Sequence, residues 1–425
     1  MKMKNRFKRL ALLLAATLTL AAVTACGSTA STDTAAPAET TTETAAETTE
    51  ETTAETAAET ESAETESAAE TEEFADEDVD GELILDHEEE LEYAQFYSLT
   101  HYKGGYKTFS VIGGQEEYEY LIVPEGKSVP ADLAEGTVVI QQPVTNLRVD
   151  SGTAANLSAW GGLDKVSNIN TEADSIAVAA VKEKMDAGDI IYTGSYKEPD
   201  YEAITAAQTQ LVIDTNMLDS NPEVKDKYTE LNIPFIVTRN SKEVHPLGHS
   251  EWAKLYGAIL GMEEEANAYF EAQVEKVNAV SNFEDTGKTV AVVYFSMDGT
   301  KVYARRGGDY MAAMVDLAGG QYIMSDFEPE ETGVATITTE EFYSLCLEAD
   351  VLINLNMAAK LYTKDELLDY VPLVEDFKAV QEGNVYHACD RFSQFTFDNA
   401  SIIEDLNKIL SDETVEETTY FTKMK

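Results

Sequence analysis

The sequence predicts an α/β protein with two Rossmann-like lobes, each a central sheet flanked by helices, joined by a single long backbone helix and preceded by a disordered acidic tether. Short apolar runs alternate with helical stretches, which is typical of parallel sheets covered on both faces. Residues 263–283 contain neither Gly nor Pro and carry apolar residues at helical spacing. We therefore expect lobes at 81–262 and 284–425, with the linking helix at 263–283 between them.

Residues 1–25 have the pattern of an export signal. Lysines and arginines at the start precede an apolar run from Leu10 to Val23 that is too short for a permanent membrane span. The run ends in Val-Thr-Ala-Cys-Gly-Ser, which resembles a bacterial lipobox, so Cys26 is predicted to be lipidated. We expect an extracytoplasmic protein that is lipid-anchored to the cell membrane; the alternative is an ordinary signal peptide with an incidental cysteine.

Residues 26–80 have the composition of a disordered tether. They are almost wholly Ala, Thr, Ser, Glu and Asp, and no Lys or Arg occurs between Arg9 and Lys103. Such a segment cannot bury enough apolar surface to fold, and its charges repel one another. Much of the formal net charge of −49 lies here, which argues against nucleic acid as a partner.

The first lobe opens with a predicted β-hairpin. Residues 109–112 and 118–123 are apolar strands on either side of Gly113 and Gly114. Further strands of this lobe, assigned to its parallel sheet, are predicted at 137–140, 190–192, 211–213 and 234–237.

The second lobe resumes the α/β pattern after the linking helix. We predict strands at 290–295, 351–353 and 384–387 and a closing helix at 399–410. Cys346 and Cys389 could form one disulfide in an oxidising compartment or remain two buried thiols.

Five stretches in this order resemble the periplasmic binding proteins for siderophores, haem and cobalamin, whose two lobes are joined by one long helix. They are residues 144–166, with Leu-Ser-Ala-Trp-Gly-Gly-Leu-Asp at 157–164; 201–213; 231–236; 316–320; and 377–386. The resemblance covers nearly all of 81–410. It implies a monomeric, non-enzymatic substrate-binding lipoprotein that captures a small molecule and works with the permease of an ABC transporter.

The arginines indicate where a ligand binds. Ligands of open α/β sheets bind beyond the carboxyl ends of the strands. All five arginines beyond the export signal are predicted to follow strands, Arg148 following the strand at 137–141; they are Arg148, Arg239, Arg305, Arg306 and Arg391. Because a guanidinium offers paired donors to anionic oxygens, we hypothesise a cationic cleft for an anionic ligand. Alternatively, they cap strand-end loops or pair with Asp150, Asp309 and Asp390 nearby.

Aromatic and histidine side chains complete the predicted ligand-binding set. Tyr196, Tyr310 and Phe392 are expected to face the cleft, whereas Trp160 is expected in the core. His249 is a candidate ligand contact. A zinc or manganese site with His245 is not assigned, because Pro246 places His245 before the helix that carries His249.

Two glutamates are candidates for docking on the permease. The resemblance implies a surface glutamate on each lobe, and the matching positions are Glu202 and Glu340. Each is predicted to open a helix, where the helix dipole also favours a carboxylate.

Other classes of function have less support. The glycine pairs lack the spacing of phosphate loops, and nucleophile-elbow and zinc-peptidase patterns do not occur, so no catalytic residue or cofactor is assigned. A surface adhesin would suit the tether but not the alternating strands and helices. The first choice of ligand is an anionic iron-siderophore chelate; cobalamin or another corrinoid and haem are the alternatives, with zinc or manganese less favoured.

Overall fold

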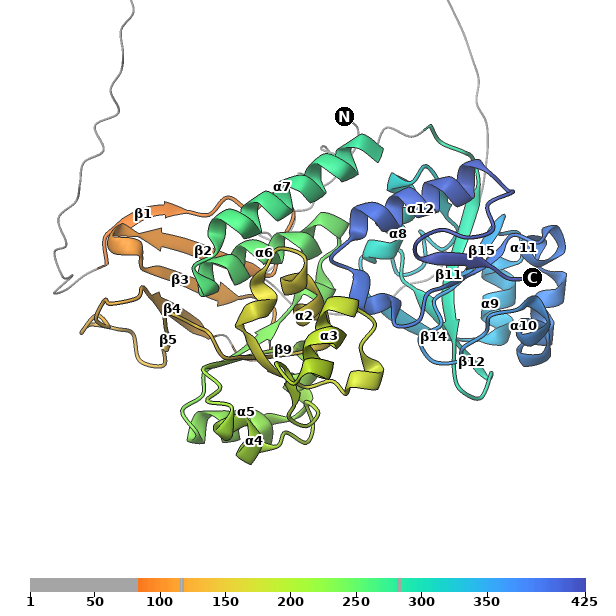
Figure 1. Ribbon diagram of the computed structural model, residues 1–425. Coiled ribbons are helices and arrows are strands. Elements are labelled where there is room, and N and C mark those ends of the chain that lie inside the picture. The colour runs from red at the N-terminus through yellow and green to blue at the C-terminus, as the bar shows by residue number, and fades with distance from the viewer. Residues whose placement is uncertain (1–82, 115, 117, 281–283) are drawn as a thin grey trace, which may run out of the picture. The chain divides into compact units, whose positions relative to one another are not determined.

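The computed structural model describes residues 83–114, 116, 118–280 and 284–425. Three β-sheets organise these residues, and helices pack against them (Figure 1). The predicted export signal, the tether and Cys26 lie outside the described residues. None of the described helices combines the length and apolar character needed to cross a membrane.

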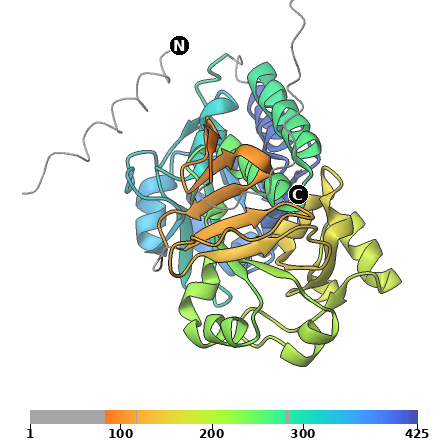
Figure 2. The ribbon, with the colours of Figure 1, turned by 90° about the vertical axis from the view of Figure 1, so that its left-hand side faces the viewer.

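The first sheet has five strands in the order β1-β2-β3-β4-β5 and faces the viewer in Figure 2. Its strands are β1 (Leu85–Glu88), β2 (Tyr97–Tyr102), β3 (Lys107–Val111), β4 (Glu119–Val123) and β5 (Val138–Gln141). β1 to β4 are antiparallel, and β3 with β4 confirms the predicted hairpin. The strand predicted at 137–140 forms, but its assignment to the parallel sheet is wrong, because β5 pairs with β4.

The second sheet is parallel throughout, in the order β10-β9-β6-β7-β8. Its strands are β6 (Leu147–Val149), β7 (Val166–Ile169), β8 (Ile191–Tyr192), β9 (Leu211–Thr215) and β10 (Phe235–Thr238). The sequence did not reveal β6 and β7, because both are short and the buried polar residues Arg148 and Asn168 interrupt their apolar runs. Arg148 therefore lies within a strand and not after one, which corrects its expected position.

Five helices pack around the second sheet: α2 (Ser151–Ser158), α3 (Ala179–Ala187), α4 (Tyr201–Ala206), α5 (Pro222–Glu230) and α6 (Pro246–Leu260). Side chains satisfy the free amides at several helix starts. Asp150 Oδ1 accepts from the amides of Gly152 and Thr153 at 2.8 and 3.1 Å. His245 caps α6, with Nδ1 accepting from the Leu247 amide, so His245 precedes that helix as predicted.

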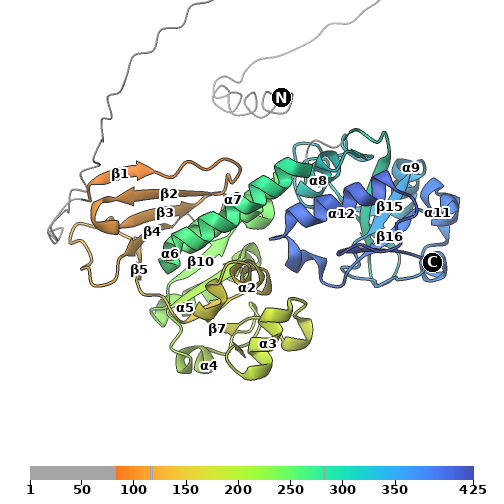
Figure 3. The ribbon, with the colours of Figure 1, turned by 45° about the horizontal axis from the view of Figure 1, so that its top comes forward.

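Helix α7 (Glu263–Val280) links the two lobes (Figure 3). Its Ala266 packs into the core of the first lobe, whereas Phe270, Val277 and Val280 pack into the core of the second. Gly257 lets α6 approach α7 closely, since a Cβ there would lie 2.6 Å from the Cβ of Ala266. The predicted linking helix is confirmed, and its last three expected residues, 281–283, lie outside the described ranges.

The third sheet runs β14-β12-β11-β15-β16-β17, with β13 also paired to β11. Its strands are β11 (Thr289–Phe295), β12 (Lys301–Arg305), β13 (Gln321–Tyr322), β14 (Val334–Thr338), β15 (Val351–Asn354), β16 (Val385–Ala388) and β17 (Phe421–Lys423). β11, β15 and β16 are mutually parallel, which confirms the three predicted strands. β12, β14 and β17 are antiparallel additions.

The helices of the second lobe are α8 (Tyr310–Leu317), α9 (Thr339–Cys346), α10 (Lys364–Tyr370), α11 (Lys378–Glu382) and α12 (Asn399–Ser411). The last of these confirms the predicted closing helix. The described chain also contains short 3₁₀ turns, at Lys103–Gly105, Gly162–Lys165, Ala173–Ser175, Asn216–Ser220, Asn240–Lys242, Pro372–Asp376 and Phe392–Phe395. Cys346 is buried, Cys389 is half-buried, and both are free thiols, as in the second alternative weighed from the sequence.

Candidate functional site

The turns that follow one parallel strand of each lobe contact each other. β7 leads into the turn Ala173–Ser175, and β16 leads into the turn Phe392–Phe395. Arg391 Nη2 donates to the Asp174 carbonyl at 2.6 Å, and Gln394 Nε2 donates to the Ser175 carbonyl at 2.8 Å. The carboxyl ends of both sheets are thereby brought to the same region, which is where open α/β sheets bind ligands.

Arg148 is engaged inside the first lobe. Its side chain is 0% exposed, Nη2 donates to the Gly194 carbonyl at 2.8 Å, and Nη1 lies 3.5 Å from Asp214 Oδ2. Burial, and then the charge of Asp150, raises the pKa of Asp214 to about 6, while Arg148 opposes that rise. The guanidinium therefore balances a buried carboxyl, and in this conformation it has no surface to offer to a ligand.

Arg239 and Arg306 also have partners within their own lobes. Arg239 is buried after β10, and its Nη2 lies 2.6 Å from Asp219 Oδ2. Arg306 follows β12, pairs with Glu328, and donates to the carbonyls of Thr332 and Val334 at 3.1 and 2.7 Å. These contacts correspond to the alternative in which the arginines support strand-end loops, although with other partners than those expected.

Three predicted site residues come together where α6 meets α8. The ring centroids of His249 and Tyr310 are 4.4 Å apart, and the Arg305 guanidinium carbon lies 5.3 Å from the Tyr310 centroid. All three residues are buried, and burial lowers the pKa of His249 to about 4. Arg305 Nε and His249 Nε2 are buried without a hydrogen-bond partner in the described protein.

The cluster has one edge near the strand ends. Arg305 Nη2 lies 3.9 Å from Met357 Sδ, and its Nη1 lies 3.5 Å from Asp309 Oδ2. Arg305 thus connects the cluster to an exposed side chain that follows a parallel strand.

The two remaining predicted aromatic contacts differ from each other. Tyr196 is half-buried in the loop after β8, with Lys197 Nζ 5.5 Å from its ring centroid. Phe392 is 1% exposed, and its ring packs against Phe421 with centroids 5.6 Å apart. The expectation that Phe392 faces the cleft does not hold in this conformation, because the ring fills the core of the second lobe. Trp160 is buried, as predicted.

Sequence reasoning missed three exposed methionines. Met217, Met297 and Met357 follow the carboxyl ends of β9, β11 and β15, and their exposed fractions are 48%, 76% and 44%. A single exposed apolar residue is ordinary, but these three each stand just beyond the carboxyl end of a parallel strand, which is where open α/β sheets bind ligands. In the sequence, a methionine stands two or three residues after each of these three apolar strands. A search for charged residues does not detect this pattern.

Two exposed tyrosines also lie at or after parallel strands. Tyr192 ends β8 with 41% of its surface exposed, and Tyr362 follows the loop after β15 with 40% exposed. Flexible thioethers and flat rings together adapt to bulky ligands of irregular outline.

A separate depression of about 690 Å³ lies elsewhere in the second lobe. Its walls include Asp285, Lys288, Asn407 and Asp412. It borders the amino end of β11, opposite to the carboxyl ends of the parallel strands. It is therefore not part of the site between the strand ends.

The two predicted docking glutamates are exposed at helix starts. Glu202 lies in the first turn of α4 and Glu340 in the first turn of α9. Asp200 caps α4, while Thr338 and Glu341 form a capping box on α9. The helix starts therefore do not require Glu202 or Glu340 as caps.

The comparison with known families accounts for this two-lobed arrangement. A sequence profile described as periplasmic binding protein matches residues 149–391, more than half of the chain. The chain belongs to the periplasmic binding protein family. The match begins at the end of β6, so the β1–β5 sheet of this binding protein lies outside it. The family is one of binding proteins and not of enzymes.

Relatives and solved structures agree with this membership. An uncharacterized lipoprotein of Methanocaldococcus jannaschii is 26% identical to this binding protein, over 78% of this chain and 85% of the relative. A second uncharacterized lipoprotein of the same organism is 25% identical, over 79% of this chain and 87% of the relative. A periplasmic heme binding protein from Pseudomonas aeruginosa has a TM-score of 0.51 at 13% identity, over 66% of this chain and 98% of that chain.

A possible iron-binding (periplasmic solute-binding) protein from Staphylococcus epidermidis has a TM-score of 0.50 at 13% identity, over 64% of this chain and 100% of that chain. The family predicted from the sequence and the α/β fold class are confirmed. The lipoprotein relatives and the family agree with an extracytoplasmic, lipid-anchored binding protein.

Proposed function

We propose that this binding protein is the solute-binding component of an ABC importer and captures an iron chelate of the siderophore type between its lobes. The observation that carries the proposal is the set of exposed methionines, Met217, Met297 and Met357, at the carboxyl ends of central strands in both lobes. The iron-binding and heme-binding descriptions of structures with the same fold support the ligand class.

The charges of the site favour a chelate with a largely apolar exterior. Four of the five arginines are paired with carboxylates in their own lobes, and the fifth, Arg391, donates to a backbone carbonyl. A ligand of high negative charge would have to compete with these partners. The cationic cleft expected from the sequence thus loses much of its support. Arg305, which reaches Met357, and Arg391, which follows β16, remain candidates for a ligand contact.

Haem is the second candidate, and the methionines favour it. A thioether can contact a planar ring system through its apolar groups and can also serve as a soft ligand of iron. The buried Tyr310 and His249 would reach such a ligand only after rearrangement of the α6–α8 junction.

We propose that Glu202 and Glu340 dock the loaded protein on the permease. Both carboxylates are exposed, one on each lobe, and neither caps its helix. Replacing each with Gln should lower uptake while leaving ligand affinity unchanged, as a docking role requires.

Ligand titrations of the full chain test the proposal. Intrinsic fluorescence and thermal shift would be followed with a neutral ferric hydroxamate, an anionic ferric catecholate, haemin and cyanocobalamin. We expect a complex with an iron chelate, tighter for the hydroxamate or haemin than for the catecholate. Selective binding of cyanocobalamin alone would contradict the proposed ligand class.

Variants locate the contact surface. Met357→Ala and Met217→Ala should each weaken binding about 5- to 30-fold, because each change removes apolar contact worth about 1–2 kcal/mol. Leu345→Ala is the matched control, since Leu345 is also exposed but lies on α9 near the amino end of β15. Equal affinities in the methionine variants and the control would remove the observation on which the site rests.

A further inference from the structure

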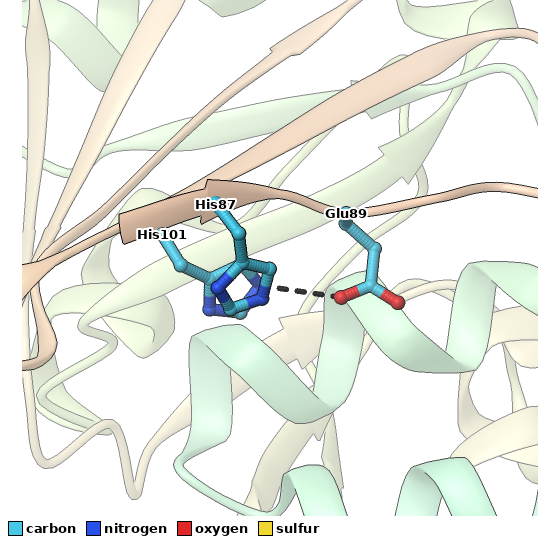
Figure 4. Close-up of side chains that lie close together, drawn as sticks. All are labelled: His87, Glu89 and His101. Atoms are coloured by element: carbon cyan, nitrogen blue, oxygen red, sulfur yellow. Dashed lines mark ion pairs between the residues drawn. The ribbon is translucent and has the colours of Figure 1, made fainter. Parts of the chain in front are cut away.

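Two histidines and a glutamate lie together at the edge of the β1–β5 sheet (Figure 4). His87 on β1 is paired directly with His101 on the antiparallel strand β2. Glu89 lies two residues after His87 and continues the ladder, with its amide donating to the Leu99 carbonyl at 2.8 Å. Alternate residues of a strand share a face, so the register places all three side chains on one side.

The donor atoms of these side chains are close to one another. One ligand atom from each residue lies within 4.8 Å of the other two, and His101 Nε2 lies 3.3 Å from Glu89 Oε2. Within residues 83–114, 116, 118–280 and 284–425, this is the one group of three or more His, Cys, Asp or Glu side chains gathered so closely. His245 and His249 do not belong to it.

One nitrogen of the group is left unsatisfied. His101 Nε2 is buried without a hydrogen-bond partner, because its approach to Glu89 is not aligned as a hydrogen bond. A buried polar atom without a partner is costly unless something else binds to it. A cation between Glu89 and the imidazoles would satisfy this nitrogen.

The surroundings orient the other donors. Asp86 Oδ2 lies 2.8 Å from His87 Nδ1, a contact that leaves His87 Nε2 free to act as a ligand. Lys254 Nζ lies 3.1 Å from Glu89 Oε1, which leaves Oε2 facing the histidines.

We propose that His87, Glu89 and His101 bind one divalent transition-metal ion of the Zn²⁺ class, at a site separate from the ligand site between the lobes. Two imidazole nitrogens and one carboxylate oxygen suit such an ion and leave a coordination position for water. The site belongs to the sheet outside the matched family region, residues 149–391.

Binding requires one local adjustment. The two imidazole rings are stacked, with centroids 4.3 Å apart and planes 7° apart, so their in-plane lone pairs do not converge. The His87 side chain is 55% exposed and can rotate, whereas that of His101 is 18% exposed and stays in place. The ion would fasten β1, whose four residues are all exposed, to β2.

Calorimetric titration of the full chain with Zn²⁺ tests the site. We expect one ion bound with a dissociation constant of about micromolar, and at least a tenfold loss in His87→Gln, His101→Gln and Glu89→Gln. Glu88→Gln is the matched control, since it lies on the same strand with its side chain on the opposite face. Unchanged affinity in both histidine variants, or weaker than about millimolar binding by the wild type, would overturn the proposal.

Two further measurements separate the site from other ligands and from misfolding. The Co²⁺ complex should lack a thiolate charge-transfer band, and such a band would assign the metal to a cysteine instead. Zn²⁺ should raise the melting temperature of the wild type. Variants that melt like the wild type in chelator but fail to respond to Zn²⁺ are folded and lack the site.

Discussion

Removal of the Glu251 carboxylate should strongly destabilise the junction between the β1–β5 sheet and helix α6 of the first lobe. Glu251 on α6 is 0% exposed, and its two oxygens accept from the backbone amides of Glu92, Tyr93 and Ala94 at 2.9, 2.8 and 2.7 Å. These amides belong to the segment between β1 and β2, so one buried carboxylate holds that segment on the lobe.

The expected cost follows from these contacts. Glu251→Ala leaves three amides without an acceptor and Lys254, 3.4 Å from Glu251 Oε1, without one of its two carboxylates. Each buried donor left unpaired costs about 1–3 kcal/mol, and water entering the cavity recovers part of that cost. We expect a loss of about 4 kcal/mol in the free energy of unfolding, and a loss of about 2 kcal/mol for Glu251→Gln, which keeps one acceptor oxygen.

Urea unfolding followed by tryptophan fluorescence measures this loss. Trp252 is buried beside Glu251, and its Nε1 donates to Glu243 at 2.9 Å, so its emission reports on the junction. Glu271→Ala, an exposed substitution on α7, is the control and should change stability by less than about 0.5 kcal/mol. A Glu251→Ala protein within about 1 kcal/mol of the wild type would refute the reasoning, because it would show that solvent satisfies the three amides equally well.

Three further outcomes are expected. Burial raises the pKa of Glu243 to about 7, so the folded state takes up a proton more readily than the unfolded state. Lowering the pH from 7.5 to 5.5 should therefore stabilise the wild type by about 2 kcal/mol relative to Glu243→Gln. Parallel pH dependences of the unfolding free energies of the two proteins in urea would contradict this. Phe392→Ala should lower the free energy of unfolding by about 3–5 kcal/mol but leave the affinity for the iron chelate unchanged. A loss of affinity in the folded variant would show that Phe392 contacts the ligand. Gly257→Val should lower the free energy of unfolding, measured by chemical denaturation, by at least about 2 kcal/mol, because its Cβ would lie 2.6 Å from the Cβ of Ala266. An unchanged free energy of unfolding would show that α6 and α7 separate freely.

The elements that were predicted correctly share one property. Strands β11, β15 and β16 and helices α7 and α12 are long or continuously apolar, so their periodicity is readable within a short window of sequence. Strands β6 and β7 were missed because a buried polar residue, Arg148 or Asn168, occupies the middle of a short strand. Such a residue is tolerated only where distant partners satisfy it, and Asp214 and Thr209 are 66 and 41 residues away in the chain.

The candidate site depends more on tertiary structure than the fold does. The rule that ligands bind at the carboxyl ends of parallel strands stays a prediction, and charge did not identify the side chains that are exposed there. Arg148 and Arg239 carry the charge expected of a ligand contact, yet each is buried against an aspartate. Met217, Met297 and Met357 carry no charge, yet they are exposed just beyond the strand ends.

The sequence by itself determined the family, the α/β class, the linking helix and the lipid-anchored, extracytoplasmic location, because these depend on local periodicity, on composition and on short motifs in a given order. Only the tertiary structure decided that β5 completes a separate sheet, that four of the five arginines pair with carboxylates, and that His87 lies opposite His101. Each of these depends on which residues meet after the chain has folded. Pairings of that kind are set by strand register and packing between distant segments, which no local pattern records.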